Sequence, residues 1–176
     1  MIGKVYAIAP QPPVPENTRW FGAGNVTIGI EYRDVDPEGL FETYRLDQGQ
    51  LAELLDRSPE GGFSDEGVSL HMKGAEDGHE YLRFDVFDSE PHYHYNHPGD
   101  EIVNNVIEFD TVAHGDMLPW ALERIRGRLA EMLGEAGGGH LVPHLDMRLV
   151  GQAVDQVATQ AERAAGAARA ARPAQP

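Results

Sequence analysis

The sequence predicts a single α+β domain in which an antiparallel β-sheet packs against one long amphipathic helix. Segments of alternating polar and apolar residues, separated by glycine, asparagine and proline, fill much of the first 110 residues. A helical repeat of apolar residues then runs from Asp116 to Glu135. We expect residues 1–150 to form this domain, and residues 151–176 to form an alanine-rich helical or mobile tail.

The sheet is expected to hold about five to seven strands. A proline-rich segment at residues 10–17 separates the first strand from the rest, since proline cannot donate to a strand ladder. On the strand at 81–87, Leu82, Phe84 and Val86 should face the core, with Tyr81, Arg83 and Asp85 on the other side. The strands are expected at residues 4–9, 20–21, 26–32, 68–73, 81–87, 92–97 and 101–109.

Two helices are predicted to accompany the sheet. A short one spans Asp47 to Arg57, with Asp47 as N-cap and three leucines along one face. The long one begins after Asp116 and ends at three consecutive glycines, which are typical of a helix C-terminus. Because its apolar residues recur at helical spacing, we expect it to lie across the sheet.

The C-terminal tail leaves three interpretations open. Its shallow stripe of valine and alanine can belong to a solvated, frayed helix, to a helix docked on its own domain or a second subunit, or to a basic peptide that engages a partner. Residues 166–176 have little to bury, and we expect them to be mobile.

The charge of the chain restricts its partners. The formal net charge is −15, and residues 75–110 hold ten acidic side chains against one basic side chain. Such a surface repels phosphate backbones, so we expect no nucleic-acid binding, although it would attract cations or a basic protein. Without a signal peptide or a long apolar run, the sequence predicts a cytoplasmic protein that does not enter membranes.

The segment from Glu90 to His97 reads EPHYHYNH and is the strongest candidate for a functional site. On a strand, His92 and His94 share one face, while Tyr93 and Tyr95 share the other. Two imidazoles one pleat apart can bind a divalent metal such as Fe, Zn or Mn, act as an acid–base pair, or hydrogen-bond within the sheet. The absence of cysteine excludes thiolate ligands.

A metal site here would need further ligands. His97, Glu101 and Glu108 are the candidates, although His97 falls on the opposite face of a regular strand. The His-x-His pair resembles a cupin strand, but the glutamate expected shortly after it and the second cupin motif are missing. Residues expected to line the site are Tyr93, Tyr95, Asn104 and Arg83.

A broader resemblance covers about a third of the chain. The runs HEYLRFDVFDSEPHYHYNHPGD and FDTVAHGDMLPWALERIRGRL, between His79 and Leu129, resemble an uncharacterised bacterial domain family. The resemblance implies a small bacterial intracellular protein and no particular activity. No serine-nucleophile elbow, phosphate-binding loop or His-Glu-x-x-His helix is present.

Two functions of different classes remain. In the first, the histidine cluster holds a metal or a small ligand, and the protein can be a metal-dependent enzyme. In the second, the protein is a non-catalytic accessory or assembly subunit, which binds a larger protein or itself through its acidic face and C-terminal helix. Metal content separates the two.

Overall fold

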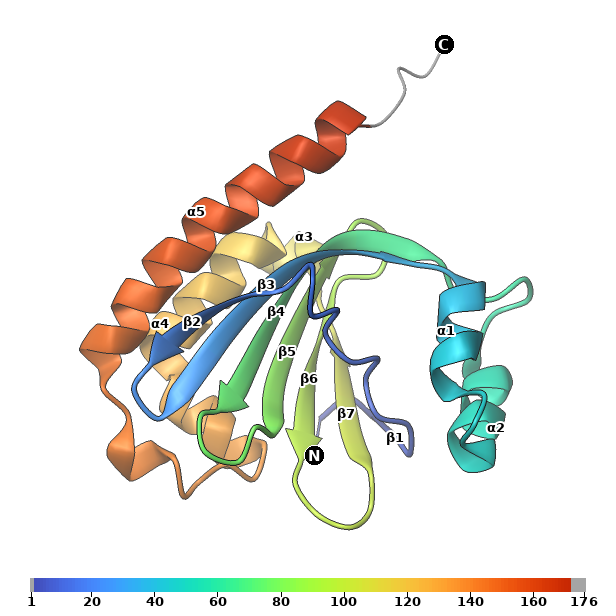
Figure 1. The fold of residues 1–176 in the computed structure, drawn as a ribbon, viewed down its shortest axis with the longest axis horizontal. Coiled ribbons are helices and arrows are strands. Elements are labelled where there is room, and N and C mark those ends of the chain that lie inside the picture. The colour runs from blue at the N-terminus through green and yellow to red at the C-terminus, as the bar shows by residue number, and fades with distance from the viewer. Residues whose placement is uncertain (1, 172–176) are drawn as a thin grey trace.

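Seven antiparallel strands form one sheet, in the order β1-β7-β6-β5-β4-β3-β2. The computed structural model describes residues 2–171 and confirms the predicted α+β class (Figure 1). The strands are β1 (Lys4–Tyr6), β2 (Arg19–Ala23), β3 (Val26–Val35), β4 (Asp65–Gly74), β5 (Glu80–Phe87), β6 (His92–His97) and β7 (Val103–Glu108). The helices are α1 (Pro37–Tyr44), α2 (Gln48–Arg57), α3 (Thr111–His114), α4 (Met117–Glu135) and α5 (Met147–Ala171), with a 3₁₀ turn at Val142–His144.

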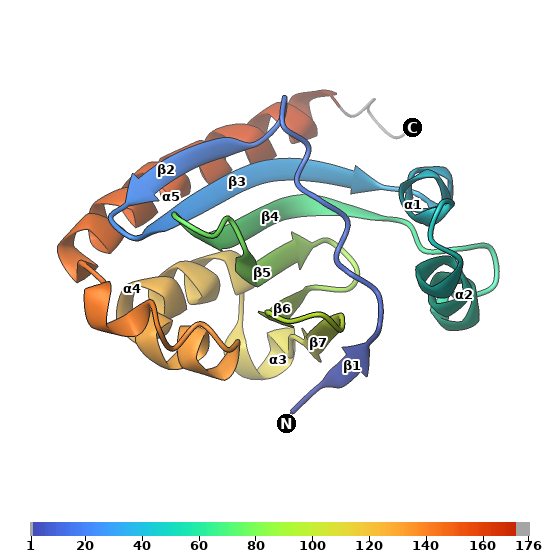
Figure 2. The same cartoon turned by 60° about the horizontal axis from the view of Figure 1, so that its bottom comes forward.

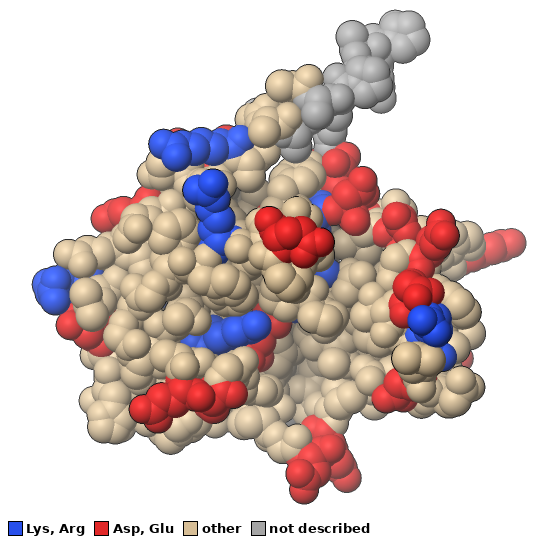
Figure 3. Space-filling view, in the orientation of Figure 1, with Lys and Arg blue, Asp and Glu red and all other residues tan. Residues whose placement is uncertain are grey.

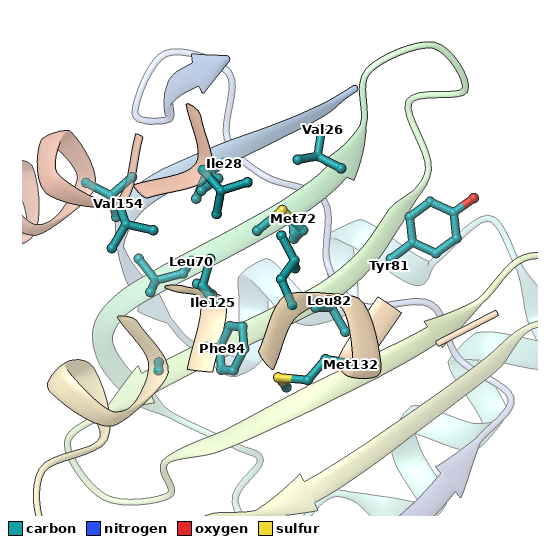
Figure 4. Close-up of a cluster of buried hydrophobic side chains, with 14 of the residues drawn as sticks. Val26, Ile28, Leu70, Met72, Tyr81, Leu82, Phe84, Ile125, Met132 and Val154 are labelled. Atoms are coloured by element: carbon teal, nitrogen blue, oxygen red, sulfur yellow. The ribbon is translucent and has the colours of Figure 1, made fainter. Parts of the chain in front are cut away.

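Helices α4 and α5 cover one face of the sheet and form the core with it. The core side chains of β3, β4 and β5 meet Ile125 and Met132 of α4 and Val154 of α5 (Figure 4). Leu82 and Phe84 of β5 point into this core, as their alternation predicts. The helical apolar stripe of α4 is therefore buried as expected.

Helix α5 docks on its own domain rather than standing in solvent. Its side chains at 150, 153, 154, 157 and 161 are fully buried, a helical spacing that forms one continuous stripe. Alanine and valine let the helix approach the sheet closely, and it packs against β2, β3 and α4. Helix α5 includes residue 150, at which the sequence predicted that the domain ends and the tail begins. This division into a domain and a tail stays a prediction. Of the segment expected to be mobile, residues 172–176 lie outside the described residues.

Tyr81 does not follow the simple alternation that the sequence suggests. The register of β4 and β5 shifts between Met72 and Lys73, which leaves Tyr81 without a partner on β4. This bulge turns Tyr81 into the core, although the sequence predicted it on the opposite face. The same shift leaves Glu80 on the polar face, where it bonds His71 and Arg83.

Two short helices and an N-terminal segment lie toward the other face of the sheet. Helix α1 was not predicted, because it is only eight residues long. It has an Asp36 N-cap and Pro37 in the first turn, but its apolar residues span too few turns to show a helical repeat. Residues 7–18 connect β1 and β2, which occupy opposite edges of the sheet, so this segment crosses the sheet (Figure 2). We call residues 7–18 the strap.

Candidate functional site

The sheet face turned away from α4 and α5 carries a continuous layer of buried polar side chains. Every central strand contributes to it. The members are Glu31 and Arg33 from β3, Ser69 and His71 from β4, Glu80, Arg83 and Asp85 from β5, His92 and His94 from β6, and Asn104 from β7. Buried polar groups are costly unless they are hydrogen-bonded, so a layer of them is a candidate for a functional site.

A cavity of about 730 Å³ opens over this layer. Its floor includes Arg83, Asp85, His92, His94 and Asn104, and its walls come from the strap, α1 and α2. Cavities of this size hold small organic molecules in other proteins. Of the four residues predicted to line the site, Arg83 and Asn104 border this cavity.

The strap is held over the floor by bonds to side chains that belong to it. Asn104 Nδ2 donates to the carbonyl of Ile8 (3.1 Å), and the Arg33 guanidinium donates to the carbonyl and side chain of Gln11 (3.1 and 2.6 Å). Further along, the backbone N–H of Val14 donates to Glu31 (3.0 Å). The strap therefore runs across the polar layer and is bonded to it at β7 and at β3.

Asp85, His92 and His94 form the centre of the site. Register pairs Asp85 with His92 across β5 and β6, and one ligand atom from each of the three residues lies within 4.8 Å of the others. Asp85 Oδ2 lies 3.0 Å from His94 Nε2 and 3.4 Å from His92 Nε2. This buried group can hold a metal ion.

The Nδ1 atoms of His92 and His94 each have a hydrogen-bond partner other than Asp85. His92 Nδ1 lies 2.6 Å from the carbonyl of Glu90, and His94 Nδ1 lies 2.7 Å from Asn104 Oδ1. Both partners are acceptors, because Asn104 uses its Nδ2 on Ile8 and so turns its oxygen to His94. Each Nδ1 must therefore carry the hydrogen, which leaves the neutral ring's lone pair on Nε2, facing Asp85.

Electrostatics shift the pKa values of the two histidines in opposite directions. Burial lowers the pKa of His94, and the charge of His92 lowers it further. The hydrogen bond with Asp85 acts in the opposite direction but does not outweigh them. For His92, burial is outweighed by the hydrogen bond and charge of Asp85, so its pKa is raised. Burial also opposes ionisation of Asp85, but its bonds with His92 and His94 and the charge of Arg83 hold its pKa well below the usual range. A neutral His94 has one N–H for two acceptors, Asn104 and Asp85.

A second cluster lies beside the first, on β3, β4 and β5. His71 sits between two carboxylates, with Nδ1 2.6 Å from Glu80 and Nε2 3.0 Å from Glu31. Both ring nitrogens of His71 therefore have a carboxylate as partner. Glu80 also accepts two bonds from Arg83 (3.0 and 2.8 Å), which joins the two clusters.

The other predicted site residues lie apart from this centre. Tyr93 and Tyr95 face α4 and line a separate hollow of about 450 Å³ with Trp120. His97 is on that same side, because β6 keeps a regular register from 92 to 97. Glu101 is exposed in a turn, and Glu108 sits at the cavity mouth, where it bonds Lys4 (2.7 Å).

Sequence reasoning missed Asp85 as a candidate ligand, although it placed this residue correctly outside the core. The signal was present in the short connection at 88–91. Extending the hairpin back from that connection sets Asp85 opposite His92. Glu31, His71 and Glu80 had no comparable signal, because each comes from a different strand or a bulge.

Comparisons with known proteins give a family and nothing finer. Among residues 2–171, no helix has both the length and the apolar character that a membrane crossing requires. No curated protein and no solved structure matches the chain. One family model matches residues 20–161, which span the sheet from β2 onward, the Asp85–His92–His94 group and most of α5. The chain therefore belongs to the family described as domain of unknown function DUF7700.

Proposed function

We propose that this protein is a metal-dependent enzyme whose Asp85, His92 and His94 hold one divalent transition-metal ion at the floor of the cavity. Two histidines and one carboxylate on a single face are the ligand set of many Fe(II) sites, and they also suit Zn and Mn. Such a set leaves other coordination positions free, here toward the cavity. An ion so held can polarise a bound substrate or activate a water molecule.

One observation carries the proposal: two imidazole lone pairs and a carboxylate oxygen are directed at one another. With both Nδ1 atoms committed to acceptors, neutral His92 and His94 would set three electron-rich atoms face to face. A cation between them removes that repulsion. Protons can do so only in part, since burial lowers the pKa of His94.

The spacing of the donor atoms supports the same conclusion. Ligands about 2.05 Å from an ion lie about 2.9 Å apart at octahedral angles and about 3.3 Å apart at tetrahedral angles. Asp85 Oδ2 lies 3.0 Å and 3.4 Å from the two Nε2 atoms. The groups outside the ligands match as well, because ligating histidines usually donate their other N–H to a carbonyl or carboxylate. Ser69 donates to the remaining oxygen of Asp85, at 2.5 Å.

Elemental mass spectrometry of the untagged protein tests the proposal. We would incubate apo protein with Fe(II), Zn or Mn, remove unbound metal, and compare wild type with His92→Ala/His94→Ala. The matched control is His140→Ala/His144→Ala, which removes two exposed histidines far along the chain from the site. We expect about one ion per chain in wild type and control, and almost none in the site variant.

Cobalt provides a readout that does not depend on stoichiometry alone. Co(II) bound by two nitrogens and a carboxylate should give visible absorption bands in wild type and control, and these should vanish in the site variant. Circular dichroism would confirm that all three proteins are folded. Equal metal loading in all three, or no loading in wild type with any of the three ions, would refute the proposal.

A further inference from the structure

Two buried arginines lie on the polar face of the sheet, and each is close to a carboxylate. Arg33 Nη1 lies 3.4 Å from Glu31, and Arg83 Nη2 lies 2.8 Å from Glu80.

A divalent ion held by Asp85, His92 and His94 would add positive charge to a layer that already contains these two arginines. Uncompensated charge at a buried position is costly, so an anion is the natural companion of the ion. This step rests on the metal site proposed above.

Arg83 is placed to receive that anion. It is the cross-strand partner of His94 in the register of β5 and β6, and it lines the cavity. Its Nε and Nη2 bond Glu80. Among residues 2–171 its Nη1 has no hydrogen-bond partner, and this atom is not fully enclosed by the protein. One N–H-bearing corner of a rigid guanidinium thus remains available to the cavity.

A second guanidinium lines the same cavity. Arg33 is buried, and burial and the charge of Arg83 both lower its pKa. Tyr44, whose hydroxyl donates to the carbonyl of Ala9 (2.7 Å), stands near both arginines and lines the same cavity. Two like charges brought together in this way favour an anion between or beside them.

The remaining wall of the cavity is apolar. Leu40, Leu54 and Phe63 line it from α1, α2 and the loop after α2, and Phe87 lines it from the end of β5. The volume of about 730 Å³ exceeds what a small inorganic anion needs. No glycine-rich phosphate loop surrounds the arginines, which favours a carboxylate over a phosphate group.

We propose that the substrate or ligand of this site is a small organic carboxylate with an apolar body. Its carboxylate binds Arg83 next to the ion at Asp85, His92 and His94. Its hydrocarbon or aromatic part lies against Leu40, Leu54 and Phe63. Because the carboxylate and the apolar wall act on different ends of the molecule, the site distinguishes an acid from its neutral amide.

Fluorine NMR with two matched probes tests this assignment on the wild-type protein. The probes are 4-fluorophenylacetate and 4-fluorophenylacetamide, which share size and apolar body and differ in charge. Line broadening would be titrated with Zn-loaded and with metal-free protein. We expect the Zn-loaded protein to bind the acid at least about tenfold more tightly than the amide, the ratio expected for a charge-assisted hydrogen bond.

Two variants identify the anchoring residue. Arg83→Lys keeps the charge but loses the fork that spans Glu80 and the ligand, and it should weaken acid binding by about tenfold without changing the weak binding of the amide. Arg148→Gln, exposed on α5 and not part of the cavity lining, serves as the matched control and should bind like wild type. Should Arg83→Lys not fold, the comparison of acid with amide on wild type still decides the question.

The outcomes separate this inference from the metal site. If the protein loads metal but binds acid and amide equally, or binds neither, the ligand class is wrong while the metal site stands. If no metal loads, the proposed function fails by itself. Preference for the acid in metal-free protein, lost in Arg83→Lys, would then still support the arginine anchor.

Discussion

Replacing Glu80 with glutamine should destabilise the protein strongly, because this carboxylate bonds two buried side chains, His71 and Arg83. It accepts from His71 Nδ1 at 2.6 Å and from Arg83 at 3.0 and 2.8 Å, with 13% of its side chain exposed. A glutamine in the same place retains one acceptor oxygen and turns an NH₂ group toward a donor. The buried Arg83 also loses its counter-charge.

The expected loss follows from those contacts. Breaking a buried pair by removing one partner costs about 3–5 kcal/mol, and we take about 3 kcal/mol because Glu80 is partly exposed. For a chain of this length, each kcal/mol shifts the melting temperature by about 2–4 °C, which gives a decrease of about 6–12 °C. Thermal unfolding would be followed by circular dichroism at pH 7 with a chelator present, and Glu76→Gln, in an exposed turn, is the matched control.

The pH dependence gives the stricter test. Burial alone would raise the pKa of Glu80, but the charge of Arg83 and the hydrogen bond and charge of His71 lower it far below the usual 4.5. A carboxyl with a lowered pKa in the folded state stabilises above its unfolded pKa, and this contribution is lost as the pH falls through its folded pKa. The difference between wild type and Glu80→Gln should therefore be largest near neutrality and narrow below about pH 4.5. A variant that melts within about 2 °C of wild type at pH 7, or a difference that stays constant from pH 7 to pH 3, would refute the reasoning.

Two further predictions concern the core. Ala161→Asp introduces a charge into the fully buried stripe of α5 and should lower the free energy of unfolding, measured in urea, by several kcal/mol. The control Ala167→Asp, exposed on the same helix, should stay within about 0.5 kcal/mol of wild type. Equal effects would mean that α5 does not dock in solution. Leu129→Ala, at a fully buried position of α4, should cost about 2–5 kcal/mol by the same measurement, and Leu46→Ala, 83% exposed, should cost almost nothing; a small loss at Leu129 would argue against the packing of α4 on the sheet.

The sequence predicts those elements whose signal is local and strong. Helix α4 has an apolar stripe that only one face of a helix can bury, so its existence and its core side were predictable. Helix α1 is too short for its apolar residues to show a helical repeat, and its two N-terminal signals are common in turns as well. The docking of α5 was left open because alanine contributes little to hydrophobic patterns, although its small size is what permits close packing.

The candidate site was predictable only in part, for a similar reason. His92 and His94 share a face because strands have a fixed twofold period, which is a local rule. Asp85 joins them through strand pairing, and Glu31 and His71 come from strands 40 residues apart. Sequence patterns indicate pairing only for strands joined by a short turn, whereas α1 and α2 separate β3 from β4, so the whole polar layer emerges only from the assembled sheet (Figure 1). The negative charge of the chain gives no hint of it either, since acidic and basic side chains are interspersed on the face shown in Figure 3.

The strap also has a consequence for how the protein is made. Its first anchor, β1, pairs with β7, and 104 residues separate Lys4 from Glu108. A ribosome adds about 5–20 residues per second, so the N-terminal strand waits for several seconds before its partner exists. The strands from β3 to β6, which carry Asp85, His92 and His94, are therefore all synthesised before the strand that holds β1 at its edge of the sheet. Until β7 exists, the strap cannot take its full path across the floor of the cavity.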